Sequence, residues 1–181
     1  MLRFLHTADL QIGMTAPGVG PMARRVQDAR VESLERVLAL GRDKNADFII
    51  VAGDLFEHNR VSASLVERTA ALLRTAPAPV FIIAGNHDYY GPDSVYNREE
   101  FRRSGDNTIV FSERRPVTFN NFDVTIYPCP CFETRSPESP VTWIQKQVDT
   151  TYHVCIAHGN LPDRIAGSDN DYPMRDEELR R

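Results

Sequence analysis

The chain has 181 residues, of which 41% are hydrophobic and 25% charged, with a formal net charge of −4 and a pI near 5.7. This composition is typical of one globular domain with a sizeable core. It excludes a disordered or strongly cationic protein, so any binding of nucleic acid must depend on local patches or metal ions. No apolar run approaches the roughly 20 residues of a membrane span and no secretory signal is present, so we expect a cytoplasmic protein with no membrane partner.

The first half of the chain alternates apolar runs with amphipathic segments. Three apolar runs end in polar residues, as strands buried on both faces do: residues 2–6, 48–52 and 80–84. Two segments carry apolar side chains at helical spacing, residues 22–44 and 64–74. Ser64 and Glu67 form a candidate capping box at the start of the second helix. We therefore predict an α/β order of strand, helix, strand, helix, strand.

The second half indicates antiparallel pairing. Short strands are expected at residues 108–111, 117–119 and 122–127, with a tight hairpin turn at Asn120 and Asn121. Further on we predict a helix over 141–148, a strand over 153–157, a loop over 162–173 and a helix from 174 onwards. We expect a single domain, residues 1–181, whose C-terminal part is missing.

The three cysteines are Cys129, Cys131 and Cys155. An odd and sparse set excludes a disulfide framework of the secreted kind, so we expect reduced thiols. Cys129 and Cys131 lack a second Cys/His pair at zinc-finger spacing, which argues against a structural zinc site.

Polar side chains follow four of the predicted strands directly, namely Asp9, Asp54, Asn86 and His158. We expect them to converge, because ligands of open α/β sheets bind at the carboxyl ends of the strands. Carboxylate and amide oxygens with an imidazole nitrogen suit Mn²⁺, Fe²⁺ or Zn²⁺ better than Ca²⁺, and one aspartate can bridge two ions about 3.5 to 4 Å apart. The sequence therefore predicts a site for two divalent metal ions.

A pair of metal ions at such a site activates water and neutralises phosphate oxygens, which predicts hydrolysis of a phosphate ester. His87 follows Asn86 and is free to protonate the leaving oxygen. We expect Asp88 to fix the orientation of the His87 imidazole and to raise its basicity.

Taken in order, these residues resemble the motifs of the calcineurin-like metallophosphoesterase superfamily: Asp9, Gly53-Asp54, Gly85-Asn86-His87-Asp88 and His158-Gly159. Within it, residues 4–13 and 53–56 are similar to DNA repair exonucleases of the SbcD type. The resemblance implies a four-layer αββα sandwich and phosphodiester hydrolysis on DNA ends. It also implies a homodimer and an SMC-like ATPase partner of the SbcC type.

By the same resemblance, Asp9 would bind the first metal, Asp54 would bridge, Asn86 and His158 would bind the second, and His87 would be the acid. Gln11 stands where the family has the histidine of Asp-x-His. Its amide oxygen is a weaker ligand, so the first metal should bind less tightly or be a different ion. The closing Gly-His-x-His motif of the family is absent, and each metal thereby loses a ligand.

Other positions leave alternatives open. Glu57 stands where the repair nucleases often have a histidine, with His58 one place on, and His6 is expected to be a hydrogen-bonded core residue. Arg102-Arg103 and Arg114-Arg115 are either phosphate contacts or ordinary solvated charges. A non-catalytic docking or dimerisation domain with a decayed site is the rival to the nuclease. A phosphatase with the same metal ligands is a third possibility.

Overall fold

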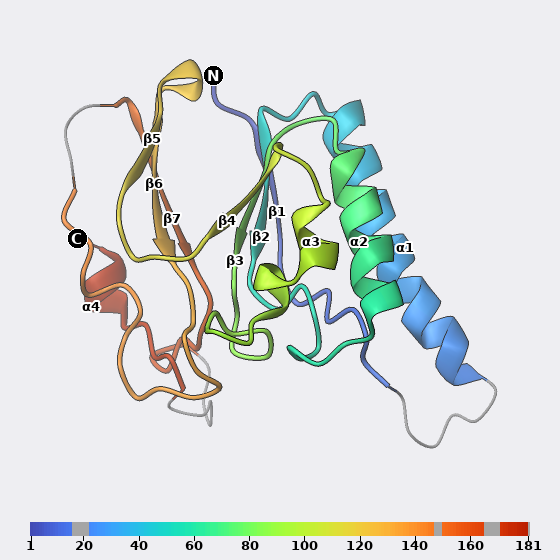
Figure 1. Ribbon diagram of the computed structural model, residues 1–181. Coiled ribbons are helices and arrows are strands. Elements are labelled where there is room, and N and C mark those ends of the chain that lie inside the picture. The colour runs from blue at the N-terminus through green and yellow to red at the C-terminus, as the bar shows by residue number, and fades with distance from the viewer. Residues whose placement is uncertain (16–21, 147–149, 165–170, 181) are drawn as a thin grey trace.

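The computed structural model describes residues 1–15, 22–146, 150–164 and 171–180. Two sheets face each other in Figure 1. Helices α1 (Ala23–Asp43) and α2 (Ala63–Arg74) cover the outer side of the first sheet, and the short helix α4 (Asp176–Leu179) lies outside the second. The mixed α/β class and the sandwich of layers predicted from the sequence are confirmed. No helix in these ranges is both long enough and apolar enough to cross a membrane.

The first sheet has the order β1-β2-β3-β4 and is parallel throughout. Its strands are β1 (Phe4–Thr7), β2 (Phe48–Ala52), β3 (Val80–Ile83) and β4 (Thr108–Phe111). Two predictions are wrong here. β1 was expected to be buried on both faces but is an edge strand with exposed and half-buried side chains, and β4 pairs parallel with β3. A short apolar run does not reveal which strand will lie beside it, and this explains both errors.

The second sheet contains β5 (Val117–Phe119), β6 (Val124–Cys129) and β7 (Tyr152–Ala157). β5 and β6 form the predicted antiparallel hairpin, whereas β7 runs parallel to β6. The hairpin turn is longer than the two residues predicted, because a 3-10 turn over Asn120–Phe122 is followed by Asp123 in a left-handed conformation.

The predicted helix over 141–148 does not form in its described part, residues 141–146, and the remainder lies outside the described ranges. Its apolar side chains pack against β6 instead: Val141 is buried beside Cys129, and the Trp143 indole N–H donates to the Cys129 sulfur at 3.4 Å. Docking of a turn onto β6 thus replaces helix formation. Of the described residues, all three cysteines are free thiols, as expected.

The helix over 64–74 is confirmed, but its cap is not the predicted one. Ser62 caps α2 by accepting a hydrogen bond from the Leu65 N–H at 3.4 Å, two residues before the expected Ser64. The short helices η2 (Val95–Asn97) and α3 (Glu99–Arg102) had no counterpart in the prediction, because segments of three or four residues carry no periodic signal.

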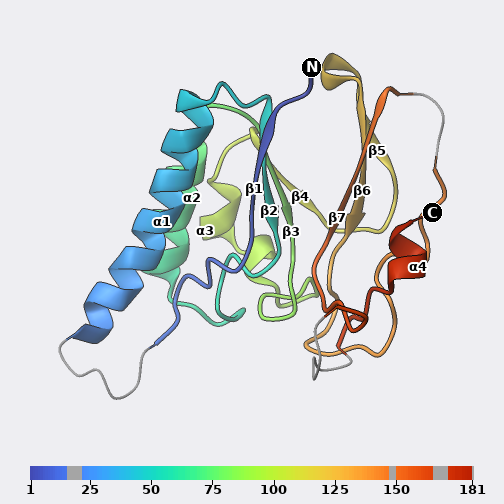
Figure 2. The same ribbon diagram turned by 180° about the vertical axis from the view of Figure 1, so that it is seen from behind.

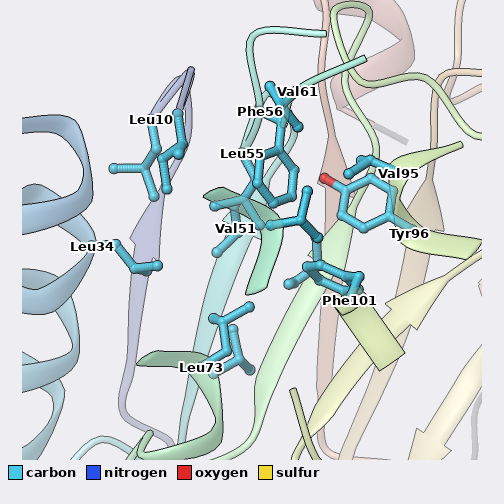
Figure 3. Close-up of a cluster of buried hydrophobic side chains, with 14 of the residues drawn as sticks. Leu10, Leu34, Val51, Leu55, Phe56, Val61, Leu73, Val95, Tyr96 and Phe101 are labelled. Atoms are coloured by element: carbon cyan, nitrogen blue, oxygen red, sulfur yellow. The ribbon is translucent and has the colours of Figure 1, made fainter. Parts of the chain in front are cut away.

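Both faces of the first sheet are covered by apolar side chains. Figure 3 shows the cluster between sheet and helices, where Val51 and Leu55 pack near Leu34 of α1 and Leu73 of α2. The opposite face carries Phe48, whose ring belongs to a second cluster between the two sheets. β2 therefore needs apolar residues at every position, as its sequence has. Figure 2 shows that the loops following β1, β2, β3 and β7 gather at one end of the molecule.

Candidate metal centre

The loops after β1 and β2 run side by side and are joined by backbone hydrogen bonds. The Asp9 N–H donates to the Gly53 carbonyl at 3.2 Å, and the Gln11 N–H donates to the Asp54 carbonyl at 2.8 Å. Asp9, Gln11 and Asp54 have left-handed backbone φ angles of 56°, 45° and 55°. Each costs on the order of 1 kcal/mol for a non-glycine residue and persists only where the surroundings impose it. All three candidate ligands are therefore held in strained positions.

A pocket of about 470 Å³ opens at this end of the sheets. It is lined by six of the seven predicted site residues: Asp9, Gln11, Asp54, Asn86, His87 and His158. Ligand atoms of Asp9, Asp54 and His158 all lie within 4.8 Å of one another. The structure thus brings together side chains from four separate strand ends.

The His158 ring has a defined orientation. Its Nδ1 lies 2.9 Å from the Ala52 carbonyl oxygen, which can only accept, so Nδ1 carries the proton. Its Nε2 lies 3.0 Å from Oδ1 of Asn86 and 3.5 Å from Oδ2 of Asp54. Since the Asp54 carboxylate is only 2% exposed and Asp9 adds a second negative charge, this electron-rich set of atoms fits a divalent cation.

Two glycines allow the strand ends to approach so closely. A Cβ atom at Gly85 would overlap Oδ1 of Asp54, and one at Gly53 would lie 2.5 Å from Nδ1 of His158. Gly53 also has a φ of 89°, which other residues rarely adopt. The Gly-Asp and Gly-Asn-His-Asp motifs therefore need glycine for space as well as for backbone conformation.

His87 is anchored through both its backbone and its ring. Its N–H donates to Oδ1 of Asp54 at 3.0 Å, and its ring Nδ1 lies 3.0 Å from the Glu57 carbonyl oxygen and 3.8 Å from Oε1 of Glu57. Nδ1 therefore donates to Glu57, and Nε2 lies 4.0 Å from Oδ2 of Asp54. The imidazole is 38% exposed, so a ligand in the pocket can reach it.

The contact predicted between Asp88 and the His87 ring is wrong. The Asp88 carboxylate is buried and accepts hydrogen bonds from the Gly85 N–H at 2.8 Å, the Phe56 N–H at 3.0 Å and the Tyr96 hydroxyl. Asp88 therefore ties the turn after β3 to the loop after β2. The place beside the imidazole belongs to Glu57, a residue the sequence marked only as a departure from a motif.

His6 was expected in the core, yet it is exposed and lines the pocket, because β1 is an edge strand. Asn160, Asp171 and Tyr172 also line the pocket and were not predicted. They come from the irregular segment after β7, where the sequence offers no periodic signal and no strand end to mark them.

The sequence profile of the calcineurin-like phosphoesterases matches residues 2–181, so the chain belongs to this family. The family consists of phosphoesterases with a dinuclear centre of divalent metal ions, and the cluster of Asp9, Asp54 and His158 is a possible metal-binding group of that kind.

Three relatives resemble the chain at low identity. An uncharacterized metallophosphoesterase, YhaO of Bacillus subtilis, is 27% identical over 88% of this chain and 41% of its own length. The DNA double-strand break repair protein Mre11 of Methanopyrus kandleri is 28% identical over 70% of this chain and 30% of its own. The D component of the nuclease SbcCD of B. subtilis is 31% identical over 52% and 23%. The chain thus spans less than half the length of these relatives.

Among solved structures, TT1561 of Thermus thermophilus aligns with 85% of this chain and 57% of its own, at 14% identity and a TM-score of 0.47. This likeness is too low to add to the family assignment.

Metal binding at this centre should stabilise the fold. With free Mn²⁺ a hundredfold above its dissociation constant, the free energy of unfolding rises by about 2.7 kcal/mol, and Tm by about 5 to 10 °C. Asp54→Ala should abolish the shift and His153→Ala should retain it, because His153 lies on β7 against Tyr127. Thermal denaturation with and without the ion measures this. An equal shift in wild type and Asp54→Ala would place the ion elsewhere.

Burial of Asp88 should make stability depend on pH. Desolvation raises the pKa of its carboxyl from 3.8 to about 6, so the folded protein keeps a proton that the unfolded chain releases. Its contribution is fully present below about pH 4 and is lost as the pH rises to about 6, at about 2 to 3 kcal/mol for the whole shift. Urea unfolding in a chelator should show this decline in wild type relative to Asp88→Asn. A difference between the two proteins that is constant with pH would contradict it.

Proposed function

We propose that the protein is a metal-dependent phosphodiesterase that cleaves DNA. The observation that carries the proposal is the meeting of Asp9, Asp54, Asn86 and His158 in one pocket, with the Nε2 face of His87 beside Asp54. A nuclease and a DNA break repair protein among the relatives support DNA as the substrate. An SMC-like ATPase partner of the SbcC type, a homodimer and a role in DNA repair belong to the same proposal.

Within this centre, Asp9 and Gln11 would hold one ion, Asn86 and His158 the other, and Asp54 would contact both. The mixed oxygen and nitrogen set favours Mn²⁺, with Fe²⁺ or Zn²⁺ as alternatives. When bound, the ions supply an acidified water and positive charge against the phosphate oxygens.

The chain's own residues supply orientation and the proton. Because Nδ1 of His87 donates to the Glu57 carbonyl at 3.0 Å, Nε2 is the atom that can deliver a proton to the leaving oxygen. The bond from the His87 N–H to Asp54 keeps the acid at a fixed place relative to the ligand set. The Ala52 carbonyl holds His158 in the tautomer whose Nε2 is free to bind a cation.

The test compares a chromogenic phosphodiester, a phosphomonoester and end-labelled DNA in Mn²⁺. We expect cleavage of the diester and of DNA, a fall of roughly 10² to 10⁴ in kcat for His87→Ala, and loss of activity in Asp54→Ala. His87→Ala should retain the thermal shift caused by Mn²⁺, which separates proton delivery from metal binding. His153→Ala is the matched control and should behave as wild type.

Two results would contradict the proposal. Faster hydrolysis of the monoester than of the diester and DNA would favour a phosphatase of the same family. Binding of DNA with no hydrolysis of any substrate and no bound metal would favour the non-catalytic domain.

A further inference from the structure

A second pocket, of about 460 Å³, lies beside the metal centre. The same two loops contribute to both pockets: Gly13 follows Gln11 by two residues, and His58 follows Glu57 by one. The remaining wall comes from the first turns of α1 and from the N-terminal half of α2.

The lining of this pocket is cationic, although the chain as a whole has a net charge of −4. Arg24, Arg60 and Arg68 contribute three guanidinium groups against one carboxylate, that of Asp28. Asp28 is already paired with Arg68 at 2.8 Å. Arg24 and Arg60 form no ion pair with any residue that the structure describes, so their charge is available to an anion.

Hydrogen-bond donors accompany this charge. Ser62 and Ser64 line the pocket at the start of α2, with their hydroxyl oxygens 3.2 Å apart. The first turn of this helix contains no acidic residue, so nothing offsets the partial positive charge of its N-terminus. The pocket therefore combines guanidinium groups with hydroxyl donors, the combination that binds phosphate oxygens.

The arginine pairs singled out in the sequence are mostly engaged elsewhere. Arg103 bonds to Glu67 at 3.0 Å and to Glu99 at 2.8 Å, and Arg115 pairs with a glutamate at 3.0 Å. Arg114 lies over the Phe132 ring. The free positive charge near the metal centre is thus contributed by residues that are not neighbours in the sequence.

We propose that this pocket binds backbone phosphates of the same DNA strand that is cleaved, a few nucleotides from the scissile one. The inference rests on the proposed function. Two residues of chain span at most about 7 Å, and a strand rises roughly 3.4 Å per nucleotide, so a strand at the metal centre reaches the pocket within a few nucleotides. Arg24 and Arg60 make the contacts, independently of base sequence.

The test is a double variant, Arg24→Gln with Arg60→Gln, against the control Arg36→Gln with Arg102→Gln, two exposed positions outside the pocket. Binding of a fluorescent single-stranded DNA with hydrolysis-resistant phosphorothioate linkages is followed by anisotropy over a range of salt concentrations. The pocket variant should bind about tenfold more weakly at low salt, and its log K against log salt slope should be shallower by about 1.4, two contacts at about 0.7 each. Lysine at both positions should restore most of the slope.

Equal affinity and slope in the pocket variant and the control would overturn the proposal. The single variants, each expected to lose about half of the slope change, serve if the double variant does not fold. Activity separates the two proposals. A wild type that binds DNA through these arginines but hydrolyses no diester retains the pocket and rejects the enzyme. An active wild type whose DNA binding ignores the arginines does the reverse.

Discussion

The buried carboxylate of Asp54 is the interaction on which the rest of the site depends. One of its oxygens accepts the His87 N–H at 3.0 Å, and the other lies 3.5 Å from Nε2 of His158. The Asp54 backbone carbonyl accepts the Gln11 N–H, which ties the loop after β1 to the same point. Because the residue is nearly inaccessible to water and sits beside Asp9, its charge needs a positive partner, and the surrounding atoms are placed to share one.

Much of this arrangement could be predicted from sequence because it depends on short-range rules. Phe48–Ala52 is apolar at every position since it contributes to both cores, and Asp54 follows it where a parallel strand must end. The same rule placed Asn86 and His158 at the carboxyl ends of their strands. The three remaining ligand and acid positions followed from neighbouring motif residues.

The errors concern interactions that only tertiary structure decides. Asp88 is adjacent to His87 in sequence, but its side chain points into the core toward Tyr96, and Glu57 contacts the imidazole from another loop. His6 is exposed because β1 lies at the edge of its sheet. The cationic pocket was missed because Arg24, Arg60 and Arg68 belong to three separate segments, whereas arginines adjacent in sequence are paired with nearby glutamates.

Anomalous X-ray diffraction from crystals grown with Mn²⁺ tests the central claim most directly. The account predicts two anomalous peaks in the pocket, both within bonding distance of Asp54, with Asp9 at one and with Asn86 and His158 at the other. Both peaks should vanish in Asp54→Ala. Absence of anomalous density in the wild type, or density bound only by surface carboxylates away from Asp54, would contradict it.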